Sequence, residues 1–191
     1  VQHLEGVRST WGTVHALVTN AGGPPPGAAA EVTLEALDRA YALTLRSAVQ
    51  AVLTVLPWMR GQGWGRVVAM TSLSVRQPID GLALSNALRA GLTGWLKTLA
   101  NEVGRDGVLV NSVCTGLFGT ERLESLFRAR SERSGRSFEE EQAAAEAQIP
   151  LGRIGRLEEF GDLVAFLCSG RASYLHGVAL PIDGGMARAL L

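Results

Sequence analysis

Residues 14–23 read VHALVTNAGG, a short apolar run that ends at once in a polar loop containing glycine. The run contains several β-branched side chains, which favour extended backbone, whereas the glycines and prolines at 22–27 continue neither a helix nor a strand. The stretch therefore predicts a buried strand over residues 14–19, followed by a loop.

Three further apolar segments along the chain end in a polar loop in the same way, and segments with apolar residues at helical spacing lie between them. Strands are expected over 66–72, 108–113 and 177–182, and helices over 2–11, 37–62, 84–103 and 157–168. Thr33 is the expected N-cap of the second helix. Apolar strands that alternate with helices are typical of an α/β fold with a parallel sheet covered on both faces. We expect one domain spanning 1–191.

The composition excludes several classes of protein. Hydrophobic residues make up 47% of the 191 positions, and 18 basic side chains balance 18 acidic ones. This apolar content excludes an intrinsically disordered chain, and zero net charge provides no long-range attraction to nucleic acid or to an anionic membrane. No apolar run reaches the ~18–20 residues that span a bilayer. Two cysteines fit a reducing compartment, so we expect a cytoplasmic protein without nucleic-acid or membrane partners.

Ligands of parallel α/β sheets bind outside the carboxyl ends of the strands, so the residues just after each strand are candidates. They are small or carry short hydrogen-bonding groups, and they include Asn20, Ala21, Gly22, Thr71, Ser72, Thr115, Gly116 and Thr120. The same residue types also form ordinary strand-ending turns. Local sequence leaves both interpretations open, and no His, Cys, Asp or Glu spacing predicts a metal site.

Four motifs occur in a characteristic order: Asn20-Ala21-Gly22, the Thr71-Ser72 strand end, VNSV at 110–113 and Asp183-Gly184-Gly185. In order and spacing they resemble the short-chain dehydrogenases/reductases. LPWMR at 56–60 and GWGRVV at 63–68 are similar to the 3-oxoacyl-(acyl-carrier-protein) reductase branch. The resemblance covers nearly the whole chain. It implies a Rossmann-type doubly wound sheet in three α/β/α layers, with NAD or NADP as cofactor for chemistry on a carbonyl, alcohol or acyl-thioester substrate.

The resemblance also implies a catalytic tetrad of Ser, Tyr, Lys and Asn. Ser72 fits the first position, but Ser85 stands thirteen residues later in place of Tyr, Arg89 replaces Lys, and Thr44 replaces the helix Asn. A serine hydroxyl has no titration near neutral pH, and a guanidinium is not deprotonated, so neither substitutes for a phenol–ammonium proton relay. Tyr41 is a possible substitute, but its spacing favours a core-facing aromatic. His15 is expected to be a core residue.

The family's Gly-rich phosphate turn is not found ahead of Asn20, so we expect the amino-terminal part of the domain to be absent from this sequence. The resemblance further implies that helices 37–62 and 84–103 pair subunits in a homotetramer or homodimer, and that 121–148 is a substrate lid. The expected function is an NAD(P)-dependent oxidoreductase with a divergent site. The alternatives are a catalytically impaired protein that binds a dinucleotide or acyl ligand, and a structural subunit.

Overall fold

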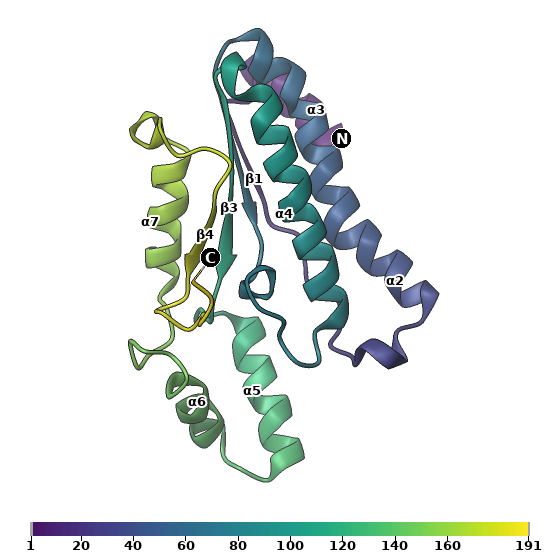
Figure 1. The fold of residues 1–191 in the computed structure, drawn as a ribbon, viewed down its shortest axis with the longest axis vertical. Coiled ribbons are helices and arrows are strands. Elements are labelled where there is room, and N and C mark those ends of the chain that lie inside the picture. The colour runs from purple at the N-terminus through teal and green to yellow at the C-terminus, as the bar shows by residue number, and fades with distance from the viewer. Residues whose placement is uncertain (1, 191) are drawn as a thin grey trace.

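The computed structural model describes residues 2–190, and its centre is a parallel sheet flanked by helices (Figure 1). The strands lie in the order β1-β2-β3-β4, with β1 pairing Val18 to Val68 of β2, and β2 pairing Val68 to Asn111 of β3. Their bounds are β1 (Ala16–Thr19), β2 (Gly65–Met70), β3 (Val108–Thr115) and β4 (Ala179–Ile182). All pairings among these strands are parallel, as the sequence predicts.

The four predicted helical segments are present to within a few residues at each end, and two further helices, α5 and α6, lie within 121–148. The helices are α1 (Gln2–Trp11), α2 (Leu34–Tyr41), α3 (Ser47–Gly61), α4 (Ala83–Val103), α5 (Glu121–Ser134), α6 (Phe138–Glu146) and α7 (Leu157–Leu167). The Thr33 hydroxyl accepts a hydrogen bond from the Ala36 N–H, so Thr33 is the N-cap of α2. A π-helical turn over Ala42–Arg46 joins α2 to α3, and the predicted helix 37–62 is therefore one rod with a local irregularity.

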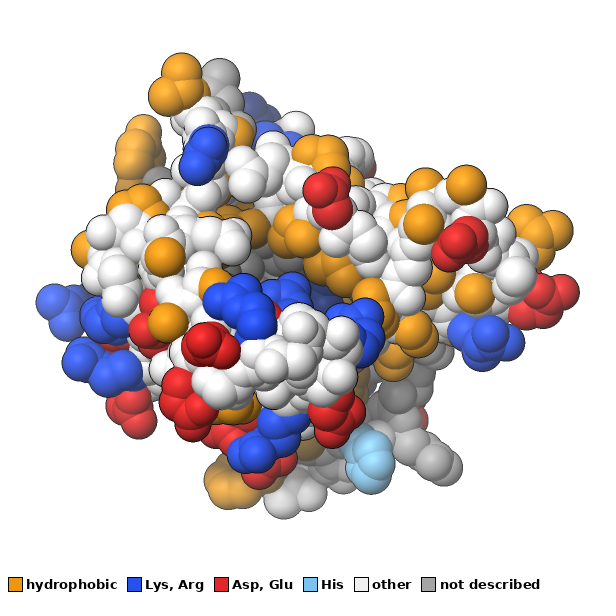
Figure 2. All heavy atoms as spheres, turned by 90° about the horizontal axis from the view of Figure 1, so that it is seen from below, with side chains coloured by type: hydrophobic (Ala, Val, Ile, Leu, Met, Phe, Trp, Pro, Cys, Tyr) orange, Lys and Arg blue, Asp and Glu red, His pale blue; other side chains and the backbone are white. Residues whose placement is uncertain are grey.

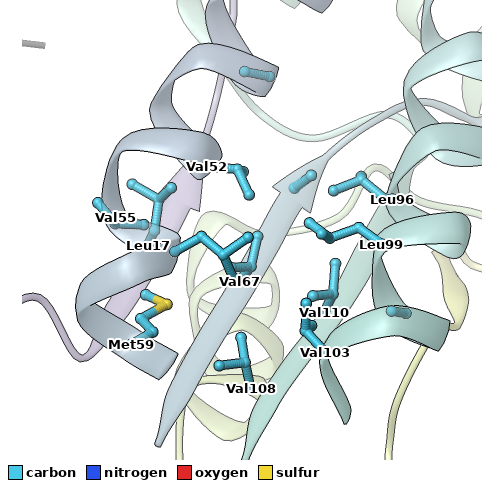
Figure 3. Close-up of a cluster of buried hydrophobic side chains, with 14 of the residues drawn as sticks. Leu17, Val52, Val55, Met59, Val67, Leu96, Leu99, Val103, Val108 and Val110 are labelled. Carbon is cyan, nitrogen blue, oxygen red and sulfur yellow. The ribbon is translucent and has the colours of Figure 1, made fainter. Parts of the chain in front are cut away.

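Successive side chains of the central strands point to opposite faces of the sheet, and helices cover both. Val67 and Val110 face α3 and α4, where they join the main core with Val52, Met59 and Leu96 (Figure 3). On the other face, β2 and β3 contribute Val68 and Val113, which pack with Leu167 of α7. The expected three layers are thus present. At β1 the cover is thinner, since Val18 is 42% exposed.

The rod formed by α2, the π turn and α3 is long and apolar enough to cross a membrane when only length and composition are considered. It spans 28 residues, Leu34–Gly61, with a mean hydropathy of 1.2 in its most apolar window. In the fold, however, Val52, Val55 and Met59 of this rod are fully buried against the sheet. One face of the rod therefore packs in the core, and 28% of its most apolar window is buried.

The α5 and α6 helices lie beyond the carboxyl ends of the strands, at the bottom of the view in Figure 1. They pack on each other through Leu123, Phe127 and Ala145, with Phe138 stacked edge-to-face on Phe127. A capping box between Ser137 and Glu140 starts α6. The segment 121–148 is therefore a helix pair with a small core of its own.

Candidate functional site

Hydroxyl groups tie the carboxyl ends of β2 and β3 together. The Thr71 hydroxyl donates to the Val113 carbonyl at 3.1 Å, and the Thr115 hydroxyl donates to the Thr71 carbonyl at 3.1 Å. Thr71 is buried and Thr115 half-buried. Both predicted site threonines thus hold the strand ends in register, while the loops that follow remain at the edge of the sheet.

Arg89 connects the ends of β1 and β2. It lies on α4, one turn after Ser85, and its Nη1 donates to the Met70 carbonyl at 3.0 Å while Nη2 donates to the Ala21 carbonyl at 3.4 Å. Met70 is the last residue of β2, and Ser72 follows two residues later. Residues from three separate elements therefore meet at one guanidinium group.

The charge of Arg89 is poorly solvated. Burial lowers the pKa of its guanidinium from the ordinary value, and the positive charge of Arg122 lowers that pKa further. Arginine nevertheless remains protonated at physiological pH, so the site holds a permanent positive charge. Arg89 is suited to bind negative charge and unsuited to exchange a proton.

Thr44 lies in the π-helical turn and faces the loop after β1. Its side chain is fully buried, and its hydroxyl donates to the Gly22 carbonyl at 3.5 Å. The turn shifts the helix register at this point, which is a common feature of functional sites in long helices. Thr44 and Arg89 thus hold adjacent carbonyls of the Asn20-Ala21-Gly22 loop, and Asn20 itself is exposed.

Ser85 lies on α4, and Ser72 is the N-cap of the short 3-10 turn over Leu73–Val75, which contacts α4. The Ser72 hydroxyl accepts a hydrogen bond from the Ser74 N–H at 3.1 Å, which leaves its own proton available for an acceptor. Ser85 is in the first turn of α4 and is 8% exposed. Ser72 is the more accessible of the two.

Gly116 and Thr120 follow β3. A methyl group at Gly116 would lie 2.7 Å from the Asp183 Cα, so this glycine allows the loops after β3 and β4 to touch. The Thr120 hydroxyl accepts from the Leu123 N–H and caps α5. Each residue thus has a structural task at the rim of the site.

Two expectations about side chains outside the tetrad are wrong. His15 is exposed and stacks edge-on against Trp64, because it precedes β1 at the sheet edge instead of lying within the core. Tyr41 is 45% exposed, so it does not face the core as its helical spacing predicts.

Comparison with known proteins identifies the family. The sequence model of a family described as "Enoyl-(Acyl carrier protein) reductase" matches residues 2–187. The 3-oxoacyl-[acyl-carrier-protein] reductase FabG of Escherichia coli K12 is 31% identical over 183 residues, which are 96% of this chain and 70% of that protein. The chain belongs to the short-chain dehydrogenase/reductase family of oxidoreductases.

Solved structures of the family have the same fold. The structure of L-sorbose reductase from Gluconobacter frateurii complexed with NADPH and L-sorbose is similar with a TM-score of 0.92 and 30% identity, covering 98% of this chain and 72% of that one. An actinorhodin polyketide ketoreductase with NADPH is similar with a TM-score of 0.90, also at 30% identity, covering 97% and 72%. The predicted Rossmann-type fold is confirmed.

In this short-chain dehydrogenase/reductase chain, the fold brings Ala21, Gly22, Thr44 and Arg89 into one hydrogen-bonded group. Sequence reasoning missed Arg122, whose guanidinium lies over Gly23 beside this group. The position of Arg122 in its helix is a sequence signal that could have identified it. Arg122 is the second residue of α5, and a cation is unfavourable at the positive end of a helix dipole unless something else requires it.

Proposed function

We propose that this chain is an NAD(P)-dependent oxidoreductase that interconverts a carbonyl and an alcohol in a divergent site, on a small carbonyl or acyl-thioester substrate. The main support is the position of Arg89, whose guanidinium joins the loop after β1 to the end of β2 at the edge where parallel α/β sheets bind ligands. The relatives named as reductases, two of them with NADPH, support the same reaction class.

The residues at the strand ends fit the nicotinamide end of a dinucleotide. Gly22 is exposed, and an added methyl group there would meet only Leu43, at 3.7 Å, so a ligand has access to the backbone of this loop. Asn20, Ala21 and Gly22 would contact the ligand, with Arg89 beneath them and Thr71, Thr115, Gly116 and Thr120 at the rim. When bound, the cofactor supplies or accepts the hydride.

Ser72 and Arg89 would polarise the carbonyl of a substrate. The Ser72 oxygen already accepts from the Ser74 N–H, so its O–H points its proton toward another acceptor. Arg89 adds a fixed positive charge close to developing negative charge, which stabilises a transition state without proton exchange. Because Ser85 does not titrate near neutral pH, the proton would come from water or through the Ser85 hydroxyl.

A second candidate function is binding without turnover, either of a dinucleotide or acyl ligand or as a structural subunit. The change of three tetrad positions, to Thr44, Ser85 and Arg89, favours it. In either case we expect the α5–α6 pair, 121–148, to act as a lid. We also expect a homotetramer or homodimer through the helices within 37–62 and 84–103, on whose first member Leu53 is 53% exposed.

The test is a titration of the full-length protein with NADH and NADPH, followed by nicotinamide fluorescence, and then a turnover assay with a 3-oxoacyl thioester. The proposal expects binding of one nucleotide and turnover that Ser72→Ala lowers by about a hundredfold or more. Ser9→Ala, an exposed hydroxyl on α1, is the matched control and should leave the rate unchanged.

Two outcomes separate the candidate functions. Binding of neither nucleotide would refute both the oxidoreductase and the dinucleotide-binding proposals. Binding without turnover favours the second candidate, and the double variant Ser85→Tyr/Arg89→Lys then distinguishes its causes. Activity gained by that variant would mean that only the proton relay was lost, whereas continued inactivity would mean that the pocket has changed more widely.

A further inference from the structure

Two arginines lie against the loop after β1. The Arg89 guanidinium lies beneath this loop and donates to the Ala21 and Met70 carbonyls. Arg122, at the start of α5, lies over Gly23, where an added methyl group would be 2.9 Å from Nη2 and 3.3 Å from Nη1. The glycine therefore leaves the space that the second guanidinium occupies.

Neither guanidinium is neutralised by an acidic side chain. Within residues 2–190 the ion pairs are Arg60–Asp106, Arg136–Glu141, Arg153–Glu159 and Arg156–Glu159, and none involves this arginine pair. Burial lowers the pKa of the Arg89 guanidinium, and repulsion by the Arg122 charge lowers it further. Arg122 is exposed and solvated by water, whereas the charge of Arg89 is partly buried and none of these ion pairs neutralises it, which favours a ligand of negative charge beside it.

Helix geometry adds to this excess of positive potential. Arg122 is the second residue of α5, so its charge adds to the positive end of the helix dipole, which Glu121 and Glu124 of the same turn partly offset. The face seen from below the strands shows several Lys or Arg side chains bordering a central hollow (Figure 2). Asp and Glu side chains are also present on this face, so the basic side chains at the hollow are local to it.

We infer that Arg89 and Arg122 together bind an oxyanion, a carboxylate or a phosphate, on the ligand of this crevice. The inference rests on the proposed function only in placing that ligand between the strand ends. Arginine presents paired N–H donors that match the two oxygens of a carboxylate or phosphate. The anion is either the carboxylate of an acidic carbonyl substrate or a phosphate of the cofactor.

The first test measures anion binding without turnover. Thermal unfolding of the full-length protein is followed in sodium phosphate and in sodium chloride of equal ionic strength. Arg122→Gln is the test variant, because Arg89 also holds backbone carbonyls. Arg130→Gln, an exposed arginine two turns further along α5, is the matched control. At ten times its dissociation constant, phosphate should raise the midpoint temperature of unfolding of wild type and of Arg130→Gln by about 3–6 °C. It should raise the midpoint temperature of Arg122→Gln by less than half as much.

Equal phosphate shifts in all three proteins, or no shift in wild type, would overturn the inference. A shift that Arg122→Gln loses would support it even if no carbonyl compound were reduced. This second result would leave the anion site standing while refuting the oxidoreductase proposal, so the two failures are distinguishable.

The second test identifies the source of the anion with matched ligands. Acetoacetate and its uncharged methyl ester are compared in wild type and Arg122→Gln, by thermal shift or as KM where turnover occurs, and NADPH is titrated by fluorescence. If the anion is a substrate carboxylate, Arg122→Gln should bind acetoacetate about tenfold more weakly than wild type and bind the other two ligands equally well. If the anion is a cofactor phosphate, only the affinity for NADPH should fall about tenfold. If Arg122→Gln leaves all three ligands unaffected, the inference is wrong.

Discussion

Replacing Gly116 by alanine tests whether this glycine is required by the strand pair or by a ligand. The added methyl group would lie 2.7 Å from the Asp183 Cα and 2.8 Å from its Cβ, about 1 Å closer than ordinary carbon–carbon contact. The first of these atoms is backbone, and the Gly116 N–H donates to the Ile182 carbonyl at 2.9 Å, so the two loops cannot separate without breaking this bond. Overpacking of this kind costs about 1–3 kcal/mol.

Gly119→Ala is the matched control, because it lies three residues further along the same loop and its methyl group would meet only the Gly155 carbonyl, at 3.9 Å. Both variants gain the same ~0.4–1 kcal/mol from a less flexible unfolded chain. The difference between their unfolding free energies should therefore equal the steric cost, about 1–3 kcal/mol.

The assay is urea unfolding followed by tryptophan fluorescence, with NADPH titration in parallel; the chain has four tryptophans. Unfolding free energies of Gly116→Ala and Gly119→Ala that agree within about 0.3 kcal/mol would refute the steric reasoning. Unchanged stability combined with lost NADPH binding would show instead that the ligand needs the glycine.

Three further predictions concern stability. Met59→Ala, at a fully buried position of α3, should lower the unfolding free energy by about 2–5 kcal/mol in urea, and Leu34→Ala, 76% exposed at the start of α2, by no more than about 0.5 kcal/mol; equal losses would contradict the assigned core. Thr33→Ala should cost about 0.5–2 kcal/mol by removing the N-cap bond of α2, and an unchanged urea midpoint would argue against that cap. Hydrogen bonding from Arg153 lowers the pKa of Glu159 to about 2, so the stability that this carboxylate contributes is complete above pH 4.5 and is lost as the pH falls toward 2. The difference in unfolding free energy between wild type and Glu159→Gln should therefore become smaller over that range when unfolding is measured from pH 7 downward. A difference that stays constant with pH would contradict the ion pair.

Local signals predicted the elements of this fold because they depend on neighbours in the chain. β1 ends shortly before the glycines and prolines of the following loop, and α2 begins at its N-cap, Thr33. The end of a strand and the start of a helix both depend on only a few adjacent residues. The solvent exposure of a side chain, in contrast, does not depend on its sequence neighbours alone. The exposure of His15 and Tyr41 differs from the prediction because burial depends on which elements pack nearby.

The sequence by itself determined the α/β class, the order of elements and the family motifs at the strand ends, because periodicity and motif spacing are properties of the linear chain. Only the tertiary structure decided that Arg89 bonds Ala21, 68 residues away, and that Arg122 lies over Gly23. It also showed that the Thr71 and Thr115 hydroxyls hold the strands together. Parallel strands align their carboxyl ends at one edge of the sheet, so residues distant in sequence create a shared electrostatic environment that no local pattern encodes.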